Sequence, residues 1–163
     1  MYQTIASFVE EWKKEAELTL RVLDKLTDAS LEQKVWEQGR TAEQLAWHLV
    51  ESIHYMTAMG LELEAPQKGT APSASSIAAA YHKISNELVT AVQGQWTEQD
   101  LLKQVEIGGE AYTYGASLQF TLMHQAHHRG QLTVLMRQGG LRAPDVYGPT
   151  KEDWLDQGME PYV

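Results

Sequence analysis

The chain has 163 residues and a formal net charge of −9 at pH 7. This length fits one domain, and the acidic balance disfavours nucleic acid and anionic membrane surfaces as partners. Cysteine is absent, which excludes disulfides, thiolate ligands and a cysteine nucleophile, and no apolar run reaches the ~18 residues of a membrane span. We therefore expect a cytoplasmic protein without a membrane segment.

The first two helices are predicted from apolar periodicity and from their end signals. Residues 2–26 place apolar side chains at spacings of three, four or seven, which makes one buried stripe of Ile5, Val9, Trp12, Ala16, Leu23 and Leu26. A second helix is expected to begin at Thr41, where "TAEQ" offers a capping box that is completed by Gln44. It is expected to end at Gly60, a residue suited to a left-handed helix terminus.

A polar connection containing proline and glycine precedes a third predicted helix, which begins near residues 73–76 and ends at about Gly94. The segments "KQVEI" and "EAYTY" flank Gly108 and Gly109 and predict a small hairpin. A fourth helix is expected from about Gly115 to Gln138. Residues from about 141 to 163 then form a tail that packs on the bundle with a short helical turn. The predicted fold class is all-α, a single four-helix bundle domain over residues 1–163.

Six histidines are present, and three of them lie within "HQAHHRGQ". His124 and His128 fall about 40° apart on one helix face, the spacing at which two imidazoles bind one metal ion, whereas His127 points about 60° to the other side. His48 shares a face of the second helix with apolar and small polar residues, so it is the best third ligand. Two interpretations stay open here: a metal site, or core histidines that protein groups satisfy.

Two segments carry a resemblance to a known family, "TAEQLAWHLVESIHYM" with His48 and "HQAHHRGQLTVLMRQGG" with the clustered histidines. They resemble the DinB/YfiT-like superfamily, and the likeness extends over nearly the whole chain. The resemblance implies a four-helix bundle, commonly a homodimer, that holds a divalent metal through His48, His124 and His128. Characterised relatives include transferases of low-molecular-weight thiols such as bacillithiol, and mycothiol-dependent maleylpyruvate isomerases. The family name reflects induction by DNA damage and implies no contact with DNA.

Three neutral imidazoles around Zn²⁺ or Ni²⁺ leave a coordination position open, which is typical of catalytic rather than structural sites. Such a metal can activate water for hydrolysis or hold a substrate thiol as a thiolate. Because the chain lacks cysteine, a reacting thiol must come from a small-molecule substrate. We predict a metal-dependent S-transferase or hydrolase. The alternative is a non-catalytic, stress-induced metal-binding bundle without turnover.

Residues one helical turn from the predicted ligands are candidates to hydrogen-bond them, namely Gln44, Ser52, Tyr55, Thr121 and Gln131. Glu51 is a candidate general base, although a solvated carboxylate at the helix edge is the competing interpretation. Arg129 is expected to be a structural ion-pair partner of another helix or of the tail. Gly130 costs about 1 kcal/mol relative to alanine within a helix, so we expect another helix to approach it closely.

Overall fold

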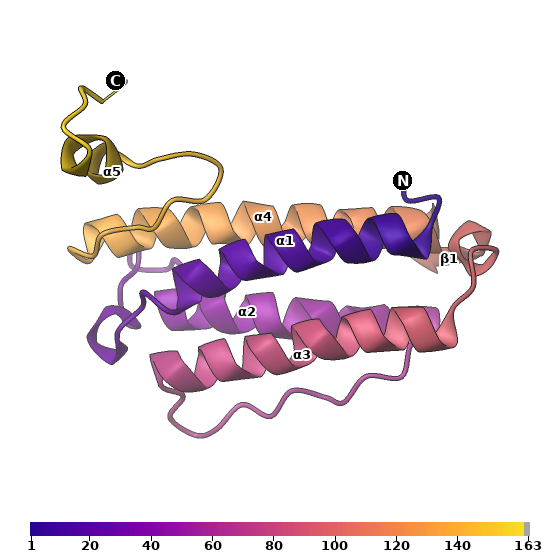
Figure 1. Cartoon of the computed structure of the whole chain (residues 1–163). Helices are drawn as coiled ribbons and strands as arrows, with labels where there is room; N and C mark the ends of the chain where they lie inside the picture. Colours follow the sequence, from indigo (N-terminus) through magenta and orange to yellow (C-terminus); the bar gives the residue numbers. More distant parts are fainter. Residues whose placement is uncertain (162–163) are drawn as a thin grey trace.

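The four periodic segments form helices whose bounds, except for the end of the second helix, lie within a few residues of the predicted ones. In the computed structural model, which describes residues 1–161, helix α1 spans Ile5–Leu23, α2 spans Ala42–His54, α3 spans Ala74–Gln95 and α4 spans Tyr114–Gln138. The predicted all-α four-helix bundle is confirmed (Figure 1). The last two residues of the predicted tail, 162 and 163, lie outside the described residues.

The predicted capping box at the start of α2 is present. The Thr41 hydroxyl accepts a hydrogen bond from the Gln44 backbone N–H at 3.2 Å, and the Gln44 side chain accepts one from the Thr41 N–H at 3.0 Å. α2 ends earlier than predicted because the chain tightens into a 3₁₀ helix, η2, over Tyr55–Met59. Gly60 follows with a φ of 79°, a left-handed conformation that glycine adopts without strain.

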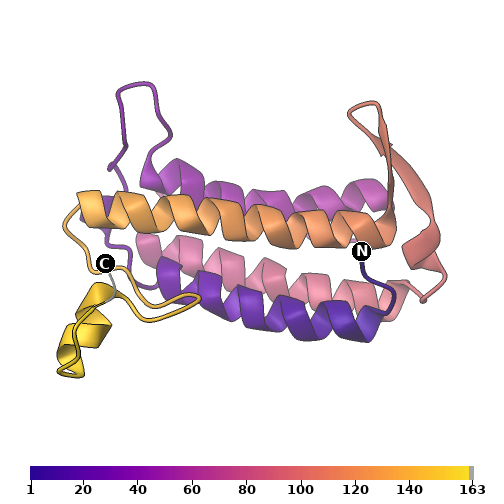
Figure 2. The ribbon, with the colours of Figure 1, turned by 90° about the horizontal axis from the view of Figure 1, so that it is seen from above.

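Helix order in space explains how distant histidines meet. α1 packs against α3 and α4, and α2 packs against the same two helices, so α2 and α4 are direct neighbours. Figure 1 shows α1 and α4 running one way and α2 and α3 the other, and Figure 2 shows the same four rows from above. Because α2 and α3 run in the same direction, the connection between them travels back along the bundle (Figure 1).

The bundle interior is filled by the apolar stripes of all four helices. Fully buried side chains include Phe8, Trp12, Leu49, Ile53, Ile77, Leu88 and Leu132. Each large apolar side chain contributes about 1.5–3 kcal/mol when it is fully buried. The stripe predicted for α1 is buried except for Ile5, which lies partly exposed against the core. Over residues 1–161, no helix combines the length and apolarity needed to cross a membrane.

The predicted hairpin precedes α4 and follows η3, a short 3₁₀ helix over Asp100–Leu102. Strand β1, Gln104–Ile107, pairs antiparallel with β2, Glu110–Thr113, and Ile107 lies opposite Glu110. Gly108 and Gly109 have φ values of 63° and 86°. Two consecutive positive φ angles are what a tight two-residue hairpin turn requires, and this is why glycine occupies both positions.

The C-terminal segment leaves the bundle at the end of α4. It contains a six-residue helix, α5, over Lys151–Asp156, which matches the predicted helical turn. α5 lies outside the four-helix array, near the end of α4 (Figures 1 and 2). A bidentate ion pair holds it there, with Arg137 nitrogens 2.5 and 2.8 Å from the two Glu152 carboxylate oxygens.

Candidate metal centre

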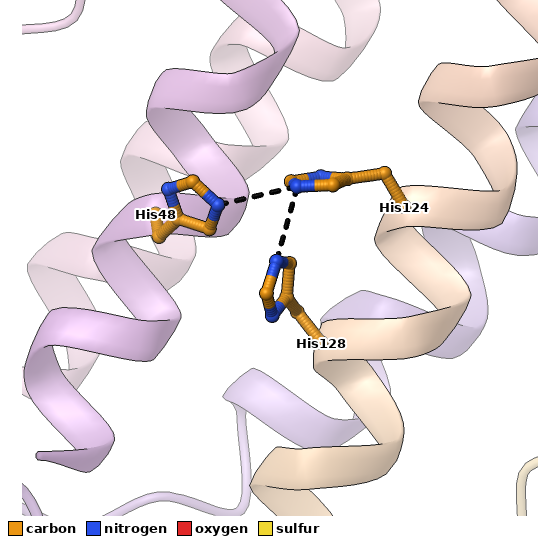
Figure 3. Close-up of side chains that lie close together, drawn as sticks. All are labelled: His48, His124 and His128. Atoms are coloured by element: carbon orange, nitrogen blue, oxygen red, sulfur yellow. Dashed lines mark hydrogen bonds between the residues drawn. The ribbon is translucent and has the colours of Figure 1, made fainter. Parts of the chain in front are cut away.

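Three imidazole rings from neighbouring helices meet between α2 and α4 (Figure 3). The Nε2 atom of His124 lies 3.3 Å from Nε2 of His48 and 3.0 Å from Nε2 of His128. All three ligand atoms lie within 4.8 Å of one another. His128 is buried, while His48 and His124 are half-buried. The structure therefore brings together the three histidines that the face geometry and the resemblance had selected.

The other three histidines contribute no ligand atom to this group. His127 is exposed, and its Nε2 contacts the side-chain amide of Gln131 at 3.2 Å. His82 is exposed on α3 and contacts Asn86. His54 lines a cavity at the end of α2. The His127 ring lies 4.8 Å from the His128 ring, centroid to centroid, but its nitrogen atoms are not part of the ligand group.

The two Nε2 separations that involve His124 fit a small divalent ion. Zinc binds histidine nitrogen at about 2.0–2.1 Å with tetrahedral geometry, which places neighbouring ligand nitrogens roughly 3.3 Å apart. The observed separations of 3.0 and 3.3 Å agree with that value. Imidazole also suits nickel, copper and iron, so the donor set fits a transition metal rather than Mg²⁺ or Ca²⁺.

Gln131 sets the tautomer of His128. Its side-chain oxygen lies 2.7 Å from Nδ1 of His128, and its amide nitrogen faces Nε2 of His127. An amide oxygen can only accept, so Nδ1 of His128 carries the proton and donates it. In the neutral ring the lone pair then lies on Nε2, which is the atom that faces the other two histidines. Metal-bound histidines are commonly oriented in this way by a partner on the second nitrogen.

The surroundings keep the three rings neutral. Burial, followed by the neighbouring His128 and His48, lowers the pKa of His124 from 6.5 to about 4. Burial is also the main cause that lowers the pKa of His48 and of His128. The Arg40 guanidinium contributes in the same direction at all three rings. Neutral imidazole is the form that binds a metal, so this environment favours ligation at pH 7.

Gln125 fixes the two ligand-bearing helices against each other. It is buried on α4 next to His124, and its amide nitrogen donates to the Leu49 carbonyl at 2.9 Å and to the Ser52 hydroxyl at 3.0 Å. Leu49 directly follows His48, so these hydrogen bonds set the helix register beside the ligands. Neither Gln125 nor Arg40 was identified from the sequence. A buried glutamine beside a ligand is a weak pattern, and Arg40 lies before the helix that carries His48.

Comparison with known proteins agrees with this fold. The sequence profile of the DinB family matches residues 1–160. The chain belongs to the DinB family. It is 42% identical to the uncharacterized protein YrdA of Bacillus subtilis, with 98% of each chain covered. It is 27% identical to the uncharacterized protein YjoA of the same organism, over 76% of this chain and 82% of YjoA.

Two solved structures match this DinB-family chain. One is a crystal structure of a DinB-like protein from Bacillus cereus, with 41% identity and a TM-score of 0.83, covering 90% of this chain and 100% of the other. The second is a DinB-like protein, YjoA from Bacillus subtilis, with a TM-score of 0.68, 22% identity and coverage of 86% and 97%. The first match supports family and fold together, and the second supports the fold. The resemblance stated from the sequence is therefore confirmed.

The five residues predicted to support the ligands have different surroundings in this DinB-family protein. Gln131 hydrogen-bonds His128 as described, whereas Gln44 is exposed and caps α2. The Ser52 hydroxyl contacts Gln125 and the Leu49 carbonyl. Over residues 1–161, Gln131 is the one member of the predicted set with a hydrogen bond to any of the three histidines.

Two further candidates near the site, Tyr55 and Thr121, lie at the cavity beside His124. The Tyr55 side chain is 62% exposed, and the Thr121 hydroxyl donates to the Ser117 carbonyl at 2.9 Å. Glu51 is exposed and accepts a hydrogen bond from the Trp47 indole at 2.8 Å. Its assignment as a general base stays a prediction.

Arg129 and Gly130 follow the histidine pair and have separate structural roles. Arg129 is 1% exposed and lies 2.5 Å from a Glu15 carboxylate oxygen on α1, so the predicted structural ion pair is confirmed. The predicted close approach at Gly130 is wrong, because a Cβ added there would meet nothing within 4 Å. The close contact on α4 occurs at Gly115, where a Cβ would lie 2.6 Å from the Tyr2 carbonyl oxygen.

Proposed function

We propose that this protein binds a divalent ion, Zn²⁺ or Ni²⁺, through Nε2 of His48, His124 and His128, and acts as a metal-dependent S-transferase or hydrolase on a small molecule. The observation that carries the proposal is the convergence of three neutral ring nitrogens within 4.8 Å. Over residues 1–161, the group contains no fourth histidine or carboxylate. A set of three protein ligands is the pattern of catalytic zinc sites, which keep a position for a reactant.

A divalent ion held there would supply Lewis acidity, which promotes deprotonation of a water for hydrolysis or of a substrate thiol for transfer. The chain contributes the rest of the chemistry. His48 and His124 are half-exposed, so a reactant can reach them from solvent. Gln131 holds His128 in the tautomer that presents Nε2.

Arg40 favours an anionic reactant. Its positive charge acts on all three rings, and it has no ion-pair partner among residues 1–161. An unpaired cation beside the site favours the approach of an anion. A thiolate, or a thiol that also carries carboxylates, would gain from this field.

Calorimetric titration of untagged protein with Zn²⁺ and with Ni²⁺ tests the metal site. We expect one ion per chain. His128→Ala should abolish tight binding because two ligands remain, and Gln131→Leu should weaken binding by about 10–100-fold because His128 loses its orienting partner. His127→Ala is the matched control from the same motif, and it should retain tight binding. A wild-type protein that takes up neither ion would contradict the proposal.

Cobalt substitution tests whether the site accepts a reactant. We expect the visible spectrum of the Co²⁺ protein to change when a small thiol or azide is added, because an open position allows an added ligand. The same samples should then show turnover on a panel of thiols paired with electrophiles. If Co²⁺ binds but its spectrum changes with neither the thiol nor azide, and no turnover is detected, the non-catalytic metal-binding alternative would be supported instead.

A further inference from the structure

A cavity of about 450 Å³ lies beside the histidine cluster, and His124 forms part of its wall. The remaining walls come from the end of α2 with η2, from the first turns of α4, and from the β1–β2 hairpin. This volume lies in the range of about 300–1,000 Å³ that is usual for small-molecule sites. The cavity is therefore large enough for a ligand next to the proposed metal.

The lining is mostly apolar, and its polar groups are the rings of His54 and His124 and several hydroxyls. It includes no aspartate, glutamate, lysine or arginine, and its large side chains include Met56, Met59, Ile107 and Phe120. Most of its hydroxyl groups already have partners, since Ser117 donates to the Thr113 carbonyl at 3.1 Å, Thr121 to the Ser117 carbonyl at 2.9 Å and Tyr112 to a Glu110 carboxylate oxygen at 2.7 Å. The Tyr55 side chain is 62% exposed. A carboxylate or phosphate placed here would lose its hydration without a compensating charge.

Phe120 and the hairpin shape this cavity. The Phe120 ring lies 5.9 Å from the His124 ring, centroid to centroid, so an occupant against Phe120 also lies beside a proposed ligand. Val105 pairs with Tyr112, and alternate residues of a strand share a face, so Ile107 and Tyr112 project from the same side of the hairpin. Both of these side chains line the cavity. The hairpin thus serves as a wall of the site.

We infer that this cavity binds the uncharged, apolar body of the substrate, an aromatic or aliphatic group whose reactive end lies at His124. The inference rests on the proposed function, which it deepens by assigning the substrate class. An acidic thiol has no countercharge among the cavity residues. Arg40, whose positive charge acts on the three histidine rings, is not among the residues that line the cavity. The two reactants would therefore reach the metal through separate surroundings.

Two fluorescent probes that differ by one charge test the cavity in the full-length, metal-free protein. N-phenyl-1-naphthylamine is neutral, and 1-anilinonaphthalene-8-sulfonate has the same skeleton with a sulfonate. We expect the neutral probe to bind once per chain and about 10-fold more tightly than the sulfonate, a difference of about 1.4 kcal/mol. Equal or tighter binding of the sulfonate, or no binding of the neutral probe, would overturn the inference.

Exposed residues allow variants that leave the core intact. Phe120→Glu and Ile107→Glu each place a carboxylate at the cavity and should weaken binding of the neutral probe by about 10-fold or more. Phe120 and Ile107 are 60% and 43% exposed, so the fold tolerates the change. Val134→Glu is the control, since Val134 is 53% exposed on the same helix outside the cavity. Similar affinity in all three variants would place the probe elsewhere.

Cobalt loading separates this inference from the proposed function. With Co²⁺ bound, the neutral probe should lose fluorescence in the wild type and keep it in His128→Ala, which holds no metal. Unquenched probe on Co²⁺-loaded protein would place the occupant away from the metal and overturn the inference. Selective probe binding by a protein that binds no metal would instead count against the proposed function and leave the cavity's preference for uncharged ligands standing.

Discussion

The pKa of the His124 ring affects two properties of the protein: how readily the site binds a metal, and how the stability of the fold changes at low pH. This pKa falls from 6.5 to about 4, first because the ring is buried and then because of the electrostatic effects of His128, His48, His127 and Arg40. Neutral rings need no proton displaced before a metal binds. The same shift has a consequence for the metal-free protein, because the unfolded chain regains the ordinary pKa.

Between pH 6.5 and about 4, the unfolded chain binds a proton at His124 that the folded chain does not. Stability rises with pH wherever the unfolded state holds more protons, so metal-free protein should lose stability as the pH falls through this window and show no such effect above it. Melting temperatures at pH 7.5, 6 and 5 measure this slope. His124→Gln should reduce the slope, to which His48 and His128 still contribute, whereas His82→Gln, which changes an exposed histidine, should leave it unchanged. An equal slope in His124→Gln would contradict the assignment.

Some residues of the site could be predicted from the sequence and others could not. The difference is whether neighbouring residues in the sequence reveal the role of the side chain. His48, His124 and His128 were predictable because helix periodicity assigns each to an inward face, and the motif resemblance joins the two helices. Gln125 was not, because its partners Leu49 and Ser52 belong to α2, and its role depends on the register between helices. Arg40 was not, because its effect on the rings depends on distances in the folded chain.

At the scale of the element, α4 contains two glycines with opposite environments. A Cβ at Gly130 would meet nothing within 4 Å, whereas a Cβ at Gly115 would lie 2.6 Å from the Tyr2 carbonyl oxygen and 3.3 Å from that of Leu101. Gly115 therefore allows the N-terminal segment and η3 to approach the start of α4. Gly130 contributes only backbone freedom to an exposed position.

Alanine at these two positions should change stability in opposite directions. Gly130→Ala should stabilise the protein by roughly 0.5–1 kcal/mol, because alanine loses less backbone entropy in a helix. Gly115→Ala should destabilise it, since the Tyr2 backbone must move. Urea unfolding of both variants measures the two effects, with each serving as the other's control. A destabilised Gly130→Ala would show that some group does pack against this position.

The elements were more predictable than their arrangement. Apolar periodicity, the Thr41 capping box and the paired glycines of the hairpin are local signals, and each reappears in the structure. The shared direction of α2 and α3 is not local. It depends on the path of residues 61–73. Their composition fits a connection that turns back at once and one that runs the length of the bundle equally well. Gly130 was misassigned for the same reason, because a glycine in a helix does not reveal which neighbour faces it.

At the scale of the whole molecule, Arg129 joins three segments that are distant in the sequence. Its guanidinium donates to the Glu15 carbonyl at 2.9 Å and to the Thr19 hydroxyl at 3.1 Å, both on α1. It also contacts the Glu15 carboxylate and the Tyr147 hydroxyl of the C-terminal segment, and Tyr147 in turn donates to that carboxylate at 2.7 Å. This network attaches the segment after α4 to α1. Its central residue, Arg129, directly follows the proposed ligand His128 in the sequence.

Removing one charge of the Arg129–Glu15 pair should lower the stability of the fold more than removing both. Arg129→Met leaves the largely buried Glu15 carboxylate without its cation, and we expect a loss of about 3 kcal/mol in the free energy of unfolding. Arg129→Met combined with Glu15→Met removes the unpaired charge, so the double variant should recover part of that loss. Tyr147→Phe removes one hydrogen bond and should cost about 1 kcal/mol. Urea unfolding of the four proteins tests this ranking. A double variant less stable than Arg129→Met would show that the paired charges stabilise the fold beyond relieving each other's burial.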